Sequence, residues 1–206
     1  MKKIKVDELI GLLEMGIYKA LHIHHTWRPD KAGFNGENHI EIASAIKNYH
    51  VNVNGWRDIG YHILVFPDGV LVTGRGFDET PASAAGHNTG AFAICLIGNF
   101  DKDHDELIGE QKDALIKLTR YFDSHDKKIL FHSDLSGKTC PGSSIDKPTF
   151  MREVREIADY NNHWAEDVIE EMMEKGIFKE TNKFRPNDSV TRAEMAVIAK
   201  RILDNK

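Results

Sequence analysis

The strongest constraint on the fold is the stretch IGYHILVFPDGVLVTGRG at residues 59–76. Two runs rich in β-branched and other apolar residues flank Pro67, Asp68 and Gly69. Proline presets φ for a turn and glycine accepts the positive φ that follows, so these residues are typical of a tight turn between two strands. We therefore predict a β-hairpin here.

Other segments alternate between strand-like and helix-like patterns. The further predicted strands are residues 19–27, 92–100 and 127–134, and the predicted helices are residues 8–20, 39–52 and 110–124. The expected apolar stripes are Ile42, Ala45, Ile46 and Tyr49 in the second helix, and Leu115, Leu118 and Phe122 in the third. This alternation predicts an α/β fold with a central mixed sheet flanked by helices.

The pattern changes near residue 160 to helix, turn-rich loop and helix. Thr191 and Glu194 are spaced as a capping box, in which each side chain accepts a hydrogen bond from the other residue's backbone N–H. We predict a first domain over residues 1–158 and a small all-α helix-loop-helix module over residues 159–206.

Composition excludes several classes of function. The chain has 206 residues, 41% of them hydrophobic, and a net charge of −5 without a basic block, so we expect no nucleic-acid partner. No window of about 18 apolar residues predicts a membrane span. Acidic residues interrupt the start of the chain, so we expect no signal peptide, synthesis in the cytoplasm, and export that depends on another protein.

The two cysteines lie in different settings. Cys95 is in AFAICLIGNF, which is typical of an inert core strand. Cys140 is in the loop FHSDLSGKTCPG, eight residues after His132. Catalytic zinc usually has three protein ligands, and a third could come from LHIHHT. Spacing alone leaves His22, His24 and His25 open, with His24 on the same strand face as His22.

Three segments together resemble the zinc N-acetylmuramoyl-L-alanine amidases of the phage-lysozyme and peptidoglycan-recognition family, the type 2 amidases. They are IHHT at 23–26, GWRDIGYHILVFPDG at 55–69 and HSDLSGKTCPG at 132–142. The resemblance spans about residues 20–157. It implies that His24, His132 and Cys140 hold one zinc ion, and that Tyr61 and Lys138 assist catalysis.

The implied reaction is hydrolysis of the amide bond between N-acetylmuramic acid and the L-alanine of the stem peptide. Zinc activates water and polarises the carbonyl group. Lys138 is suited to stabilising the oxyanion, and Tyr61 to orienting the water or donating a proton.

Several nearby residues keep two readings. Trp27 is a candidate for stacking on a sugar or peptide, or a cover for the core. His87 and Asn88 are candidates for lining a substrate groove. His22, His25 and His62 are expected to serve packing or to support the ligands. Asp134 would either accept a hydrogen bond from a ligating histidine or cap a loop.

The tail at residues 163–204 resembles a single S-layer homology module, which attaches proteins to secondary polymers of Gram-positive-type walls. The resemblance places Trp164 and Arg192 near an anionic glycan. One module alone is marginally stable, so we expect it to lean on the first domain or on another copy, which would make an oligomer. A helical appendage with only a packing role is the alternative.

The favoured function is a phage or prophage endolysin that acts on peptidoglycan after release through a phage pore protein or by lysis. A host autolysin with the same activity is the first alternative. A non-catalytic peptidoglycan-binding protein is the second, and Cys140, Lys138 and Tyr61 speak against it.

Overall fold

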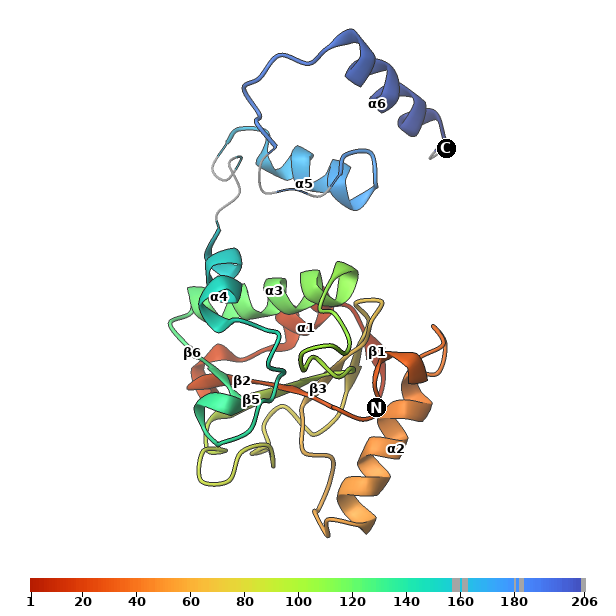
Figure 1. Ribbon diagram of the computed structural model, residues 1–206. Coiled ribbons are helices and arrows are strands. Elements are labelled where there is room, and N and C mark those ends of the chain that lie inside the picture. The colour runs from red at the N-terminus through yellow and green to blue at the C-terminus, as the bar shows by residue number, and fades with distance from the viewer. Residues whose placement is uncertain (157–159, 161–162, 180, 182–183, 205–206) are drawn as a thin grey trace. The chain divides into compact units, whose positions relative to one another are not determined.

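The computed structural model describes residues 1–156, 160, 163–179, 181 and 184–204 (Figure 1). The chain forms two compact units, Met1–Val154 and Arg155–Lys206. The predicted domain boundary between residues 158 and 159 lies outside the described residues. Among the helices of the described ranges, none combines the length and the apolar character that crossing a bilayer requires.

A six-stranded sheet forms the centre of the first unit, with the strand order β1-β4-β3-β5-β2-β6. The strands are β1 (Lys3–Ile4), β2 (Ala20–His25), β3 (Ile63–Val65), β4 (Leu71–Thr73), β5 (Ala91–Leu96) and β6 (Lys128–Phe131). β2 pairs in parallel with β5 and β6, and β3 in parallel with β5. β4 is antiparallel to β1 and β3. The predicted mixed sheet is confirmed.

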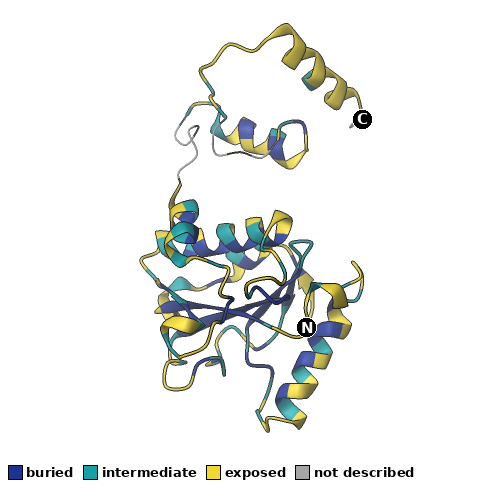
Figure 2. Ribbon diagram, in the orientation of Figure 1, coloured by how far each residue is buried: buried dark blue, intermediate teal, exposed yellow. Residues whose placement is uncertain are grey.

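Helices cover the two faces of this sheet unequally (Figure 1). They are α1 (Val6–Leu12), α2 (His39–Asn52), α3 (Gly109–Ser124) and α4 (Lys147–Arg155). The first, third and fourth pack on one face, where the core includes Leu9, Leu118 and Phe150. α2 packs on the other face, against a core that includes Leu64 and Cys95 of β3 and β5. Figure 2 shows the central strands almost entirely buried.

The predicted hairpin is confirmed as β3 and β4. Val65 pairs with Leu71 across the turn, and Gly69 has a φ of 75°, which explains the need for glycine. A side chain there would also meet the backbone oxygen of Glu110 at 3.0 Å. The turn therefore sits tightly against the start of α3.

The helix predicted over residues 39–52 is confirmed in extent, but its apolar stripe is partly wrong. Ile42 and Ile46 are buried as expected, whereas Ala45 and Tyr49 are exposed. Two histidines occupy the buried face instead. Nε2 of His39 lies 2.8 Å from an oxygen of Asp68, and Nδ1 of His50 accepts the N–H of Gly60. One paired ring nitrogen in each histidine offsets part of the cost of this burial, whereas Nδ1 of His39 has no hydrogen-bond partner among the described residues.

The helix predicted over residues 8–20 is wrong in its bounds. α1 occupies residues 6–12, a short 3₁₀ turn follows at Met15–Ile17, and β2 begins at Ala20. Gly11 and Gly16 weaken a continuous helix, and the residues from Ala20 onward pair with other strands of the sheet. We did not predict β1, because a strand of two residues is too short to show an alternating hydrophobic pattern.

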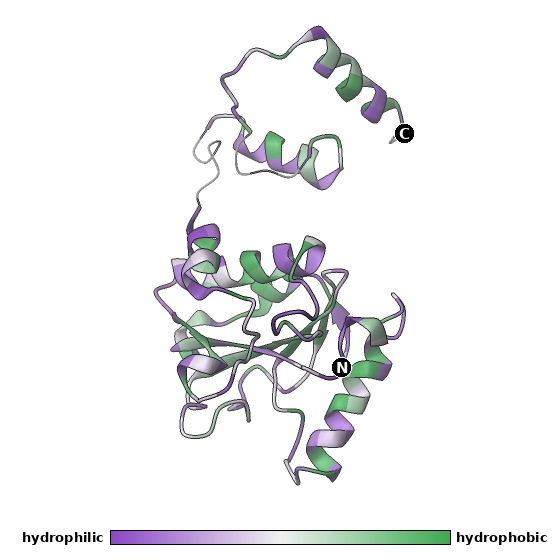
Figure 3. Cartoon of the chain, in the orientation of Figure 1, coloured by the Kyte–Doolittle hydropathy of each residue, from purple (hydrophilic) through white to green (hydrophobic). Residues whose placement is uncertain are grey.

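The second unit contains α5 (Glu166–Glu174) and α6 (Arg192–Asp204), as predicted. The capping box is confirmed: the N–H of Thr191 donates to Glu194 at 2.8 Å, and the N–H of Glu194 donates to the Thr191 hydroxyl at 3.2 Å. A small core forms around Ile169 and Met173. α6 has no buried residue, although it carries apolar side chains (Figures 2 and 3).

Candidate metal centre

Two parallel strands bring the predicted ligands together. His24 lies near the carboxyl end of β2, and His132 directly follows the adjacent strand β6. Carboxyl ends of parallel strands meet at one edge of a sheet, where sites usually form. Cys140 returns to this edge in the loop after β6. One donor atom from each of these three side chains lies within 4.8 Å of the other two.

The separations fit a zinc ion. Nδ1 of His24 is 3.6 Å from Sγ of Cys140. Zinc–sulfur and zinc–nitrogen bonds of about 2.3 and about 2.05 Å, meeting at a tetrahedral angle, would separate these atoms by about 3.6 Å. The rings of His24 and His132 are 4.7 Å apart. Nε2 of His24 is buried and has no hydrogen-bond partner among the described residues.

The electrostatic surroundings keep both imidazoles neutral. Burial lowers the pKa of His24 well below its ordinary value, and the neighbouring His132 and Lys138 lower it further. Burial and Lys138 also lower the pKa of His132. Because a metal binds the neutral ring, both histidines are ready to act as ligands at neutral pH.

Cys140 has the opposite requirement. Burial raises the pKa of its thiol to about 11, against the lowering effect of the His25 backbone N–H and of Lys138. That N–H donates to Sγ at 3.4 Å. A metal ion binds the thiolate, so metal uptake at neutral pH must release the thiol proton.

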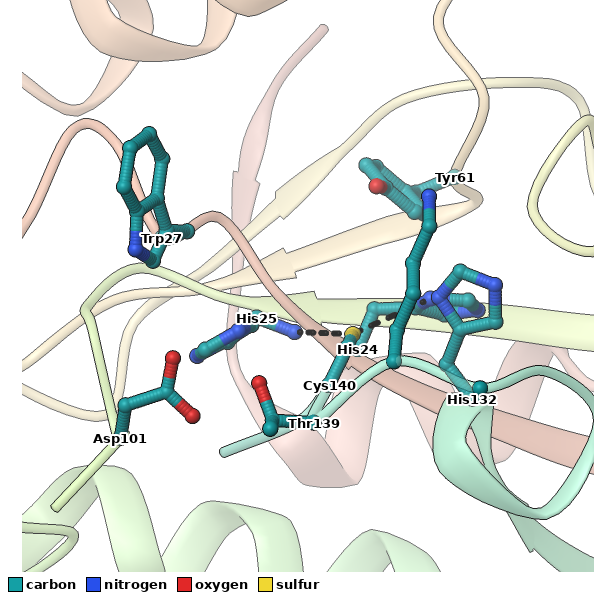
Figure 4. Close-up of a pocket in the computed structure, with 10 residues that line it drawn as sticks. His24, His25, Trp27, Tyr61, Asp101, His132, Thr139 and Cys140 are labelled. Atoms are coloured by element: carbon teal, nitrogen blue, oxygen red, sulfur yellow. Dashed lines mark hydrogen bonds between the residues drawn. The ribbon is translucent and has the colours of Figure 1, made fainter. Parts of the chain in front are cut away.

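The three side chains open into a pocket of about 540 Å³. Tyr61, Lys138 and Trp27 line it, as do the side chains of His25, Asp101 and Thr139. Figure 4 shows Tyr61 and His132 on one side of Cys140, and Trp27 and Asp101 on the other. A pocket of this volume can hold a small molecule, and the polar side chains at the base of the pocket would orient it.

Tyr61 lines the pocket beside His24. Its ring is 5.3 Å from that of His24. Burial raises the pKa of its hydroxyl well above the ordinary value, and the sulfur atoms of Cys95 and Cys140 add to the effect. The hydroxyl therefore stays protonated at neutral pH, and a hydrogen bond with the Cys95 side chain contributes to this raised pKa. Its catalytic role, like that of Lys138, stays a prediction.

Other predicted binding residues lie outside this pocket. His87 is exposed, and the amide oxygen of Asn88 accepts the backbone N–H groups of Ser83 and Ala84. Asn88 therefore shapes its own loop. Neither residue lines the pocket around the ligands, and their contact with substrate stays a prediction.

The predicted polymer-binding residues of the tail are both at the surface. Trp164 is 90% exposed. Arg192 lines a separate shallow depression together with Val190 and Met195, and Trp164 is not among its lining residues. The structure therefore does not bring the two into one depression.

Two of the open alternatives are decided by hydrogen bonds. Both ring nitrogens of His62 are paired, Nε2 with the Glu79 carbonyl at 2.8 Å and Nδ1 with the Ala93 N–H at 2.9 Å. His62 is thus a packing residue. Asp134 accepts the N–H of Phe131 at 2.8 Å and so caps its loop.

The remaining histidines of β2 differ in face. His22 points to the same side as His24, with its Nδ1 3.5 Å from the Ser83 hydroxyl. His25 points the other way, and its Nδ1 accepts the N–H of Phe100 at 3.1 Å. In both histidines Nδ1 has a partner within the protein, as expected for residues that serve packing or support the ligands.

Sequence reasoning missed Asp101 and Thr139 as pocket residues. The hydrogen bond from the Ser143 N–H, together with that from Thr139, holds the pKa of Asp101 below its ordinary value in spite of some burial. One signal was present: Asp101 comes soon after β5, whose carboxyl end lies beside that of β2.

The fold and the site define a class of protein: an α/β domain with a sheet-edge pocket whose base can bind a divalent metal through two imidazoles and a thiolate. Sequence comparison agrees with this class. The profile of the N-acetylmuramoyl-L-alanine amidase family matches residues 15–143, and that of the S-layer homology domain matches residues 156–196. The chain belongs to the N-acetylmuramoyl-L-alanine amidase family and carries an S-layer homology domain.

Individual relatives agree with this assignment. N-acetylmuramoyl-L-alanine amidase of Mus musculus is 28% identical over 129 residues, which are 61% of this chain and 24% of the relative. Peptidoglycan-recognition protein SC1a of Drosophila melanogaster is 32% identical over 60% of this chain and 67% of its own length. This chain thus spans about a quarter of the length of the mammalian relative.

Among solved structures, the endolysin N-acetylmuramoyl-L-alanine amidase LysCS from Clostridium intestinale matches with a TM-score of 0.54 and 25% identity. The match covers 67% of this chain and 85% of the other. The expected α/β fold is therefore confirmed. These comparisons give no support to the expected oligomer.

Proposed function

We propose that this protein is a zinc-dependent hydrolase that cleaves the amide bond between N-acetylmuramic acid and L-alanine in peptidoglycan. One observation carries the proposal: a donor atom of His24 lies within 4.8 Å of donor atoms of His132 and Cys140, which are more than 100 positions further along the chain, at the base of a pocket. Membership of the amidase family supports the choice of bond.

The side chains around the ligands fit this reaction. Zinc held by these ligands would supply an activated water molecule and polarise the amide carbonyl group. Lys138 brings a positive charge next to the ligands, where it would stabilise negative charge growing on the carbonyl oxygen. Tyr61, protonated at neutral pH, would donate a hydrogen bond to that oxygen or to the leaving nitrogen.

The site of action in this proposal is the bacterial cell wall, reached after release from the cytoplasm through a phage pore protein or by lysis. The likeness to an endolysin of Clostridium intestinale supports a role in phage lysis. The S-layer homology domain favours retention on a wall polymer, which would also suit a host autolysin.

The deciding experiment compares wild type with Cys140→Ala. We expect about one zinc ion per wild-type chain, measured by atomic absorption, and release of new amino groups from purified walls without new reducing sugar ends. Cys140→Ala should lose both the zinc and the cleavage. Cys95→Ala, which removes a buried thiol outside the metal-binding group, should keep the zinc.

Retention of zinc and a normal cleavage rate in Cys140→Ala would contradict the ligand assignment. A wild-type protein that binds walls but releases no amino groups would instead support the non-catalytic alternative.

A further inference from the structure

The pocket has two chemically different sides. Figure 4 shows Trp27 and Asp101 together on one side of Cys140, with Tyr61 and His132 on the opposite side. The amide bond proposed as the target also has two different sides, a sugar and a peptide. The residues that line each side indicate which part of the substrate each side receives.

Trp27 is held in a strained backbone conformation. Its φ of 58° is rare for a bulky residue and costs about 1–3 kcal/mol. Two hydrogen bonds hold it in place: the Trp27 N–H donates to the Gly98 carbonyl at 3.0 Å, and the Gly98 N–H donates to the Thr26 hydroxyl at 2.9 Å. The end of β2 and the segment after β5 therefore fix the backbone from which the indole ring projects.

The indole ring is not used to fill the core. It is 54% exposed although it lines the pocket, and the Arg28 guanidinium lies 5.2 Å from the ring centre. A half-exposed indole offers a broad, flat, apolar surface with few rotatable bonds. One hexose ring, whose C–H groups form an apolar face, would fit such a surface.

Asp101 supplies a hydrogen-bond acceptor next to this surface. The Ser143 N–H donates to one of its oxygens at 2.9 Å, which holds the carboxylate in position. An ionised carboxylate has about four acceptor sites, so it can accept further bonds from hydroxyl or amide groups. An N-acetylated sugar carries both kinds of donor.

Charge distinguishes the sugar from the peptide. Stem peptides of peptidoglycan carry carboxylates, which Asp101 would repel. Lys138 lines the pocket, and its positive charge lowers the pKa of His24 and His132. This charge would attract the carboxylates of the peptide. The peptide therefore suits the side of the pocket with Lys138, and the uncharged sugar suits the side with Asp101.

We propose that Trp27 and Asp101 form the sugar-binding side of the pocket, with the indole stacked on an N-acetylated hexose ring and the carboxylate accepting from its hydroxyl or acetamide group. This inference rests on the proposed function, because it assigns the two halves of that substrate to the two sides of the pocket.

Calorimetric titration of the full chain tests the assignment with two probes, of which one lacks the peptide and the other lacks the sugar. One is the disaccharide of N-acetylglucosamine and N-acetylmuramic acid, and the other is the free stem peptide. Trp27→Ala should weaken disaccharide binding by about tenfold, Trp27→Phe by less, and Asp101→Asn by about tenfold. Peptide binding should not change.

Matched controls come from the same unit. Tyr49→Ala removes an aromatic ring of similar exposure, 57%, from outside the pocket, and Asp103→Asn neutralises an exposed carboxylate nearby. Neither should alter disaccharide binding. Trp27→Phe keeps an aromatic ring, so the test stands even where Trp27→Ala fails to fold.

Loss of peptide binding with intact disaccharide binding in Trp27→Phe and Asp101→Asn would overturn the assignment, as would wild-type protein that does not bind the disaccharide at millimolar concentration. Because neither titration involves cleavage, these outcomes are distinct from failure of the proposed hydrolysis, which would show as walls without new amino groups.

Discussion

His24 illustrates how the surroundings of one side chain define its chemistry. It shares β2 with His22 and His25, yet its Nδ1 alone among these rings lies 3.6 Å from the Cys140 sulfur. Its neighbours in the strand have their own partners, the Ser83 hydroxyl and the Phe100 N–H. The predicted ligand is thus distinguished from its two neighbouring histidines by the partner that each ring nitrogen has.

Lys138 and Tyr61 are expected to act on the reaction and not on the metal. Lys138→Ala and Tyr61→Phe should each slow amide cleavage by about 10²–10³, because each removes one charge or donor near the reacting carbonyl group. The zinc content of both variants should stay at the wild-type level. Lys102→Ala, an exposed lysine outside the pocket, serves as the control. Loss of zinc in either variant would show a structural role instead.

His62 should make stability depend on pH. Burial lowers its pKa from 6.5 to about 4 in the folded protein. Between these values the unfolded chain binds a proton that the folded protein does not, so the free energy of unfolding falls as pH falls from about 6.5 to about 4. The loss is up to about 1.4 kcal/mol per pH unit, and the stabilisation is complete above pH 6.5.

Urea unfolding of wild type and His62→Gln at several pH values measures this effect. The substitution should lower stability at pH 8, where it removes a well-packed ring, and should also flatten the decline below pH 6.5. An equally steep decline in both proteins would rule out His62 as its source.

Arg75 connects the hairpin to the segment that carries Tyr61. Only 6% exposed, it donates from Nε to the Ile59 carbonyl at 2.8 Å, from Nη1 to the Thr80 carbonyl at 2.7 Å, and from Nη2 to the Asp58 carbonyl at 3.1 Å. Its own N–H donates to the Tyr61 carbonyl at 2.9 Å. One guanidinium therefore satisfies three backbone carbonyl groups from two loops that lie outside the strands.

Arg75→Met should destabilise the protein by about 3–4 kcal/mol, because it leaves three backbone acceptors without their charged donor. Arg57→Met is the matched control: this exposed arginine pairs with Glu79 at the surface, and its loss should cost less than about 1 kcal/mol. Urea denaturation measures both. Equal effects of the two substitutions would refute the role of Arg75.

The two units of the chain match two different protein families. The amidase match at residues 15–143 lies within Met1–Val154, and the S-layer homology match at residues 156–196 lies within Arg155–Lys206. Each unit has its own buried cluster. Cleavage and attachment to the wall should therefore be separable.

A chain ended after residue 156 should still cleave a soluble muropeptide, because every pocket residue precedes that point. It should sediment less with purified walls, because it lacks the S-layer homology domain. Circular dichroism of the shortened chain checks that the first unit is folded. Equal sedimentation of both chains would mean that the tail does not bind the wall.

Local patterns were sufficient for features whose causes lie within a few residues. The turn at Pro67–Gly69, the extent of α2 and the capping box of α6 were predicted correctly, since proline, glycine and side-chain caps act on their own backbone. The ligand assignment was reached only by resemblance, because spacing left three histidines of β2 open.

The tertiary structure decided what depends on distant segments. Parallel pairing of β2 with β5 and β6 brings His24, His132 and Asp101 to one edge, and the carbonyl of Gly98 holds Trp27 at the pocket. Buried partners also placed His39 and His50, not Ala45 and Tyr49, on the inner face of α2. Strand order and long-range hydrogen bonds create these contacts, and no local periodicity in the sequence encodes them.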